Sequence, residues 1–351
     1  MIETIFKLPI LSDFRAILNT ALPLGISYMG GMLIGVTDGV MLGRLSPDAL
    51  GAAGLALSIC NIMMLLGWGM LFPMVVLVSR RYDKKCSRTR IPFEVIRQSL
   101  WVCGILSIPS YAILWNTTHI LILSGQDPTL ARMVGQYMDY YLWAIFPIFA
   151  RAAFALALIA MHRTVTIAII TWLEATLNII LDYGLIFGKL GFPAMGMAGA
   201  GLASVIVYSV GHTILFFSIF GFRQFFREIR VKNVWKPNWD ILGQFTRLGW
   251  PKGLEYLIIN AIFSIFALLS GWISIQTIAA NTIALQIVAL VSYTLPWAVA
   301  DIVTVRVSAA FAGKSHVDMW RALNGGIMVL FVLLLPLMMI FWGLIRLTDE
   351  I

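Results

Sequence analysis

Residues Ala16–Leu42 read AILNTALPLGISYMGGMLIGVTDGVML, a run of 27 residues that is almost wholly apolar. About 20 such residues, wound as a helix, cross the roughly 30 Å hydrocarbon core of a bilayer. The run therefore predicts a transmembrane helix, in which Pro23 removes a backbone hydrogen bond and favours a bend. Asp38 lies near the other end. A carboxylate there either faces a cavity or a partner, the interpretation we favour, or lies at the water interface.

The composition of the whole chain agrees with this stretch. Of its 351 residues, 60% are hydrophobic and 12% are charged, and the mean hydropathy is +0.88. These values are typical of a polytopic membrane protein and not of a soluble domain. The net charge of +8 comes from Lys and Arg in loops, so it does not indicate nucleic-acid binding. The three cysteines have no ligand spacing, so neither a disulfide framework nor a metal site is predicted.

Apolar runs of similar length recur along the chain, and the predicted fold class is an all-α polytopic membrane protein. The length of a bilayer-spanning helix divides the sequence into about nine transmembrane helices. Their predicted ranges are 16–42, 49–79, 93–123, 132–161, 165–187, 197–220, 246–272, 277–310 and 322–346.

Positive charge is concentrated in alternate loops. Six Lys or Arg residues lie between spans 2 and 3, and five lie between spans 6 and 7, whereas the intervening loops carry few. We expect the chain in a bacterial inner membrane. Because basic loops stay on the cytoplasmic side, the N-terminus is expected on that side too. Nine spans would then leave Ile351 outside. We interpret these basic loops as determinants of topology that also contact anionic lipid.

An internal repeat relates the two parts of the chain. With a shift of 228 residues, ten of the 37 positions from Pro23 to Ile59 are identical, and the PxGxxY motif that begins at Pro23 returns at Pro251. A unit of six spans inserts with the same orientation each time, as in a two-lobed transporter. We therefore predict a first six-helix lobe at 1–222, a cytoplasmic linker at 223–245 and a second lobe at 246–351.

The second copy holds only three of the six spans that the first copy has. If the second copy were as long as the first, it would contain roughly 100 more residues, or three more helices. The sequence therefore predicts an incomplete second lobe.

Polar side chains in the first lobe share a similar depth. Asp38, Asn178, Asp182, Ser204 and Asp139 lie roughly 6–13 Å from the predicted outer ends of their spans, at 1.5 Å per residue. Two carboxylates with an amide and a hydroxyl suit a proton or a small hard cation such as Na⁺. Carboxylates that are close together in an apolar setting do not both stay ionised easily, so one exchanges a proton near neutral pH. The alternative is a set of polar groups that are satisfied separately.

Further charged residues lie inside the predicted spans. Glu174 is on the same helical face as Asn178 and Asp182, at i, i+4 and i+8 spacing, and by depth it is the candidate partner of Arg151. In the second lobe, Glu255 and Asp301 are candidate intramembrane carboxylates. Arg306, at the cytoplasmic end of span 8, is expected to extend toward the membrane surface.

Catalytic motifs are absent from the sequence. HExxH, GxSxG and P-loop patterns do not occur, so no catalytic residues, cofactor or metal are predicted beyond a coupling ion, H⁺ or Na⁺. Gly196, Gly199 and Gly201 are interpreted as small residues that permit close helix packing.

Several segments resemble the multidrug and toxic compound extrusion (MATE) family, in its NorM-like branch. They are the Pro23 helix with its aspartate 15 residues later, VTDGVMLGRLSPDALGAAGLA at 36–56, NIILDYGLIFGKLGFPAMGMAGAGLAS at 178–204, GWPKGLEY at 249–256 and PWAVADIVTVRVSAAFAGK at 296–314. The resemblance covers essentially the whole chain and implies a two-lobed helical bundle, which is complete with twelve helices and surrounds a central cavity.

The resemblance also implies a cation site in the first lobe. The family's ligands map to Asp38, Asn178 and Asp182, and to Ser204 where the family has a threonine. One departure concerns the second lobe: the position of a frequent glutamate is Ile259 here, and Glu255, one turn earlier, is the candidate substitute. The second departure is that the last three helices of the family pattern are missing from this sequence.

We therefore expect a cation-coupled antiporter that exports small organic cations or amphipathic drugs and contacts membrane lipid, with no nucleic-acid partner. A flippase for lipid-linked precursors is the alternative within transport, although it would favour a strongly cationic cavity. A truncated, non-transporting fragment is the alternative from another class. The sequence indicates neither the substrate, nor the choice between H⁺ and Na⁺, nor the oligomeric state.

Overall fold

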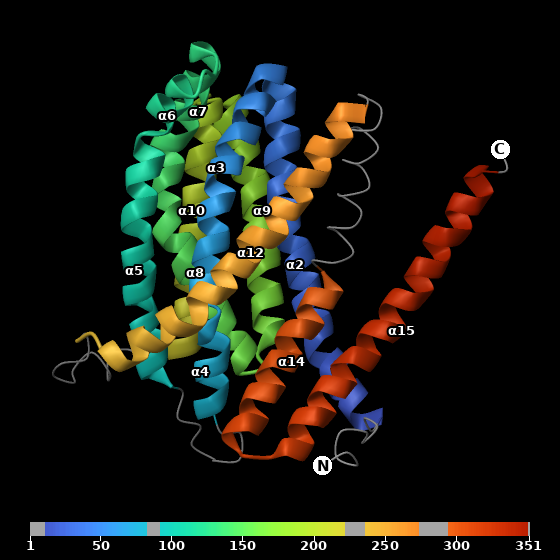
Figure 1. The fold of residues 1–351 in the computed structure, drawn as a ribbon. Coiled ribbons are helices and arrows are strands. Elements are labelled where there is room, and N and C mark those ends of the chain that lie inside the picture. Colours follow the sequence, from blue (N-terminus) through green and yellow to red (C-terminus); the bar gives the residue numbers. More distant parts are fainter. Residues whose placement is uncertain (1–10, 83–91, 222–235, 274–293, 350–351) are drawn as a thin grey trace.

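The computed structural model describes residues 11–82, 92–221, 236–273 and 294–349, and every regular element in these ranges is a helix. Eight helical stretches within them are long and apolar enough to cross a membrane. Figure 1 shows the long helices running between two ends where the loops gather. The predicted all-α, multi-pass membrane fold is therefore confirmed.

Most predicted spans coincide with helices to within a few residues. The first part of the chain forms α2 (Leu11–Leu45), α3 (Pro47–Leu71), α4 (Pro73–Arg81), α5 (Phe93–Trp115), α6 (Thr117–Leu123), α7 (Pro128–Tyr141), the 3₁₀ turn η1 (Leu142–Ala144), α8 (Ile145–Ala160), α9 (Thr164–Phe187) and α10 (Met197–Phe220). The second part forms α12 (Trp239–Ile273), α14 (Leu295–Ala312) and α15 (His316–Asp349). Pro23 lies inside the continuous helix α2, and the bend there stays a prediction.

Three predicted spans are interrupted. Pro73 starts α4 directly after α3, because a proline ring suits the first turn of a helix but breaks an interior turn. A turn at Asn116 likewise separates α5 from α6. The 3₁₀ turn η1 at Leu142–Ala144 separates α7 from α8 in the fourth span. Before that span, Asp127 caps α7 by accepting hydrogen bonds from the backbone N–H groups of Leu130 and Thr129. These two bonds stabilise the charged carboxylate and lower the pKa of Asp127.

The second part departs further from the predicted boundaries. α12 already begins at Trp239, inside the predicted linker, because Asn238 Oδ1 accepts from the backbone N–H groups of Asp240 and Ile241. The seventh predicted span lies in this 35-residue helix. The eighth begins at 277, outside the described residues, and its described part is α14. The boundaries of the two lobes stay a prediction.

Small residues bring the helices of the first part into close contact. A side chain at Gly199 would collide with the backbone of Leu185 on α9, and one at Gly201 with the backbone of Tyr137 on α7. Gly196 serves differently, since its φ of 56° forms the turn before α10. The predicted close packing is thus confirmed for Gly199 and Gly201.

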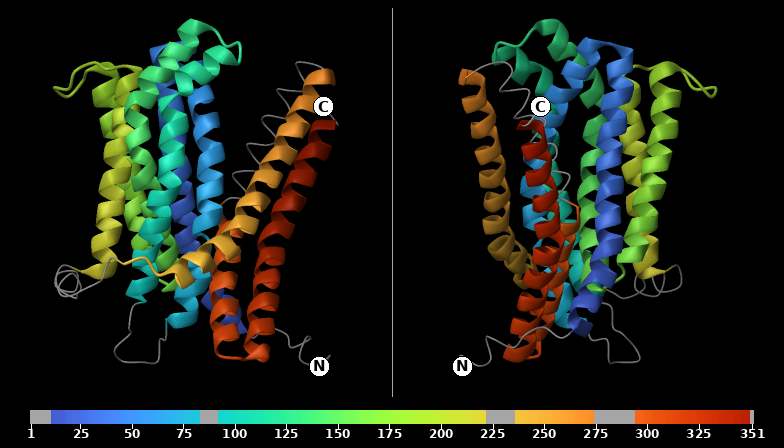
Figure 2. Two further views of the ribbon diagram at one scale, coloured as in Figure 1. Left: turned by 60° about the vertical axis from the view of Figure 1, so that its left-hand side comes forward. Right: turned by 90° about the vertical axis from the view of Figure 1, so that its right-hand side faces the viewer.

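The two parts of the chain meet near the lower end of the molecule, where α12 and α14 contact α2, α3 and α4. At Gly69 on α3, an added side chain would collide with the backbone of Gly253 on α12. On the neighbouring helices, Arg306 of α14 pairs with Asp13 of α2 at 3.0 Å. We call this region the basal junction. Above it, α12 and α15 lean away from α2–α10, as the side views show (Figure 2).

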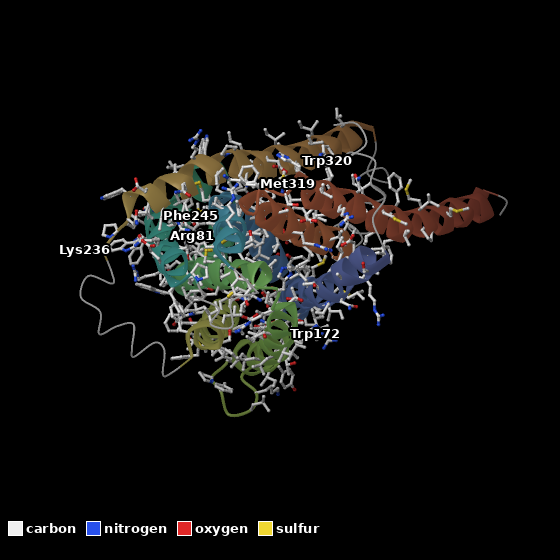
Figure 3. The ribbon with its side chains drawn as sticks, turned by 90° about the horizontal axis from the view of Figure 1, so that it is seen from below. Arg81, Trp172, Lys236, Phe245, Met319 and Trp320 are labelled. Atoms are coloured by element: carbon white, nitrogen blue, oxygen red, sulfur yellow. The ribbon has the colours of Figure 1, made fainter. Side chains whose placement is uncertain are left out.

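Seen from below, α12, α14 and α15 occupy one side of the molecule, and α9 and α10 occupy the other (Figure 3). Phe245, labelled in that view, is fully buried on α12. Trp172 on α9, labelled on the opposite side, donates from its indole N–H to the carbonyl of Ile26 on α2 at 3.1 Å. Because α2 also pairs with α14 through Asp13 and Arg306, it lies between the two sides.

The orientation of the bundle is a testable prediction. The two basic loops, at 83–91 and 222–235, lie outside the described residues, but the helices that flank them end at the lower side of Figure 1. We expect reporter fusions after Arg90 and Lys236 to show cytoplasmic activity, and a fusion after Gln126 to show periplasmic activity. The reverse pattern would contradict the positive-inside interpretation.

Candidate cation site in the first six spans

Helix α9 aligns three polar side chains on one buried face. Glu174, Asn178 and Asp182 follow at intervals of four residues, so they lie one above another on the same side of the helix. All three are at most 1% exposed. The common face predicted from their spacing is therefore confirmed, and it points into the first part of the molecule instead of toward lipid.

Asp38 on α2 meets this face. The side-chain N–H of Asn178 donates to Asp38 Oδ1 at 3.0 Å, and the carboxyl group of Asp182 lies within hydrogen-bonding reach of the carboxyl group of Asp38. The polar groups are enclosed by apolar packing, which includes Ile34, Ala175, Leu181 and Leu185. The structure thus brings together Asp38, Asn178 and Asp182, as their shared depth suggested.

Three oxygens of this cluster have no donor among the described side chains. Among the described side chains, both Asp182 oxygens and Asn178 Oδ1 are buried without a hydrogen-bond partner. Two ionised carboxylates can only accept hydrogen bonds, so contact between Asp38 and Asp182 requires a proton or a cation between them. Buried acceptors that are left unsatisfied are unfavourable, so the cluster is complementary to a small positively charged ligand.

Ser204 lies next to this cluster through an intermediary. Its side chain, which is 1% exposed on α10, forms a hydrogen bond with Tyr137 on α7, and Tyr137 in turn lies within electrostatic range of Asp38. The ring of Tyr137 stacks on that of Tyr141 with centroids 5.0 Å apart. The side chain of Ser204 therefore contacts the cluster by way of Tyr137, which the sequence did not single out as a site residue.

One turn before Asn178, Glu174 binds Arg151. Arg151 on α8 donates from Nε to Glu174 Oε1 at 2.6 Å and from Nη2 to Oε2, which forms a bidentate pair. Its Nη2 also donates to Thr171 Oγ1 at 3.0 Å, and Thr171 bonds Ser27 of α2 at 3.0 Å. The pairing predicted from depth is confirmed, and it neutralises Arg151 inside the bundle.

Three other acidic residues that the sequence singled out lie apart from the cluster. Asp139 is exposed on α7, so equal depth did not bring it to the buried face. Glu255, the candidate carboxylate of the second lobe, has a side chain that is 51% exposed and pairs with Lys252 at 2.6 Å. Asp301, in contrast, is buried and accepts a hydrogen bond from the hydroxyl of Tyr28. Arg306 pairs with Asp13 of α2, and its extension toward the membrane surface stays a prediction.

Sequence reasoning missed Tyr137, Thr171 and Ser27 as neighbours of the charged groups. Tyrosine and hydroxyl residues are common in membrane helices, and nothing in their spacing distinguishes a partner from a packing residue. Tyr28 did carry a signal, since it is the tyrosine of the repeated PxGxxY motif.

A multi-pass helical bundle that buries acidic and amide side chains in its interior has the architecture of a membrane transporter. The MatE family model matches residues 23–184. The probable multidrug resistance protein NorM of Mesorhizobium japonicum is 31% identical over 339 residues, covering 94% of this chain and 71% of its own length. The namesake from Rhizobium meliloti is 30% identical over 314 residues, covering 89% and 66%.

The chain belongs to the MATE family, whose members are transporters and not enzymes. A solved structure described as the outward-facing conformation of a multidrug resistance MATE family transporter of the MOP superfamily shares the fold, with a TM-score of 0.76 at 21% identity. The alignment covers 93% of this chain and 71% of that one. The chain thus spans about two thirds of the length of the relatives that it matches.

Proposed function

We propose that this chain acts in cation-coupled antiport, exporting small organic cations or amphipathic drugs in exchange for inward movement of H⁺ or Na⁺. The observation that carries the proposal is the buried cluster of Asp38, Asn178 and Asp182, with both oxygens of Asp182 unpartnered among the described residues. The names of the relatives support the multidrug cargo, and the loop charges support a bacterial inner membrane with a cytoplasmic N-terminus.

The cluster would couple two gradients by binding the ion in one state of the helices better than in the other. An ion shifts a conformational equilibrium only by its difference in affinity for the two states. Asp38 lies on α2, which also contacts α14 at the basal junction, so the helix that holds the ion touches both parts of the chain. Binding or loss of a cation at Asp38 would thereby bias how α12, α14 and α15 pack against α2–α10.

The flippase alternative receives less support from the charges. A cavity for a polyanionic lipid precursor needs cationic side chains that are free to bind it, and Arg151 is already engaged by Glu174. Among the described side chains of α2–α10, three buried acceptor oxygens, of Asn178 and Asp182, lack a partner, against one donor, Nε of Arg97 near the start of α5. This balance favours a cation over an anion.

Transport in liposomes tests the function. The purified 351-residue chain is reconstituted, and movement of the fluorescent cation ethidium is followed under an imposed pH gradient or an imposed Na⁺ gradient, each with the other held at zero. We expect one of these ion gradients to drive ethidium across the membrane in the direction opposite to the ion flow. Ethidium movement should stop when that gradient is collapsed. Equal ethidium movement in liposomes with no protein would contradict the proposal.

A further inference from the structure

Two tyrosines that are related by the internal repeat lie near the same buried carboxylate, that of Asp301. Tyr28 on α2 and Tyr256 on α12 occupy the same place in the two PxGxxY motifs. The hydroxyl of Tyr28 donates to Asp301 Oδ2 on α14, although 273 residues separate them in sequence. Tyr256 lies within electrostatic range of both Tyr28 and Asp301, and its ring packs against Trp297 with centroids 5.6 Å apart.

Asp301 is buried without an ion pair. It is 7% exposed, and none of the ion pairs formed by the described residues includes it. Lys252 comes within electrostatic range, but its ammonium bonds Glu255 and lies over the rings of Phe72 and Tyr256. The hydrogen bond that this carboxylate accepts therefore comes from the phenol of Tyr28.

The Tyr28–Asp301 bond lies in the basal junction, where the two parts of the chain meet. Asp13 and Arg306 join the same two helices nearer their lower ends, and the guanidinium of Arg80 on α4 lies over the ring of Phe311 on α14 at 4.9 Å. Among the described residues of this junction, Asp301 is the acidic side chain that is buried, and its hydrogen bond with Tyr28 joins α14 to α2.

We propose that Asp301 and Tyr28 form a proton-sensitive latch that holds the basal junction closed. When Asp301 is ionised, the phenol donates a charge-assisted hydrogen bond, which is roughly twice as strong as its neutral counterpart. Protonation weakens the bond and favours separation of α14 from α2. Tyr256, the repeat-related phenol on α12, lies within electrostatic range of the carboxylate, so a second phenol is available near Asp301 when Tyr28 leaves.

The sign of the pH dependence follows from the ionised form. Higher pH ionises Asp301, strengthens the bond and closes the junction, whereas lower pH opens it. The charged groups around the latch are Lys252, Arg306, Arg80 and Asp13, and each is engaged in the contacts described above. The latch rests on the proposed antiport and deepens it, because it supplies an acidic group outside the cation site, but its test does not depend on transport.

Spin-label distances across the lower end test the latch. Exposed Arg163 and His316, each replaced by Cys, carry the labels on the two sides of the junction. Cys86 is replaced by Ser, whereas Cys60 and Cys103 are buried and stay. All proteins also carry Asp38→Asn and Asp182→Asn, which removes titration at the candidate cation site. Distances are measured in detergent at pH 5 and pH 8 with the parent, Tyr28→Phe and Asp301→Asn.

We expect the parent to shift toward longer distances at pH 5, with a roughly fivefold change in the ratio of the two populations, given the strength of charge-assisted bonds. Tyr28→Phe and Asp301→Asn should already show the longer distance at pH 8 and lose the pH response. The matched controls Asp139→Asn and Tyr183→Phe, at exposed positions, should behave like the parent. A pH response that persists in both latch variants, or is absent from the parent, would overturn the latch and leave the antiport proposal standing.

Discussion

Asp38→Asn and Asp182→Asn are each expected to abolish gradient-driven ethidium transport by the reconstituted chain while leaving its expression and folding intact. Asn keeps the shape of Asp but cannot hold the negative charge that attracts a cation, so each variant leaves the buried cluster with one carboxylate in place of two. The loss should exceed roughly tenfold, since a charge pair that shares one ion contributes well over 1.4 kcal/mol to binding it.

The matched control is Asp139→Asn, which removes a carboxylate on the exposed face of α7. It changes the net charge by the same amount, so any effect of charge alone appears in it too. Its transport should stay near that of the parent. Unchanged transport in both Asp38→Asn and Asp182→Asn would mean that the cluster does not carry the coupling ion.

Arg151→Met is expected to lower the stability of the folded chain strongly. It leaves the fully buried carboxylate of Glu174 without its bidentate partner, and an uncompensated buried charge costs about 3–5 kcal/mol. Gly211 on α10 faces the same carboxylate so closely that a side chain there would collide with it, so Glu174 has little room to find another partner.

A double-mutant cycle separates the lost pair from the lost packing. Arg151→Met, Glu174→Met and the double variant are compared by thermal denaturation in detergent, with intrinsic fluorescence as the readout. The double variant should be closer to the parent than Arg151→Met is, because it removes both charges and fills similar volume. Additive losses would show that the two side chains do not interact energetically.

The fold was largely predictable because the bilayer constrains it so strongly. Long apolar runs must form helices when no water can satisfy the backbone, and the runs at 165–187 and 197–220 match α9 and α10 almost residue for residue. Helix interruptions were harder to place. Pro73 and Asp127 end or begin helices through local geometry, which hydropathy averaged over a span does not register.

The candidate site was predictable to the extent that it lies on single helices. Spacing along α9 correctly placed Glu174, Asn178 and Asp182 on one face, and depth correctly paired Glu174 with Arg151. Depth alone failed for Asp139, because it fixes height in the membrane but not the direction in which a side chain points. The contact of Tyr28 with Asp301 joins two helices that are far apart in the sequence. A periodic pattern within one helix cannot predict such a contact.

The central claim, that Asp38, Asn178 and Asp182 bind the coupling ion, is tested most directly by measuring ion binding to the purified chain. Proton uptake between pH 8 and pH 5 and equilibrium binding of radioactive Na⁺ at pH 8 are compared in the parent and in the Asp38→Asn/Asp182→Asn double variant. The account predicts that the parent takes up about one more proton per chain than the double variant, or binds a Na⁺ that acid displaces and that the double variant does not bind. Superimposable proton titrations together with equal Na⁺ binding would contradict it.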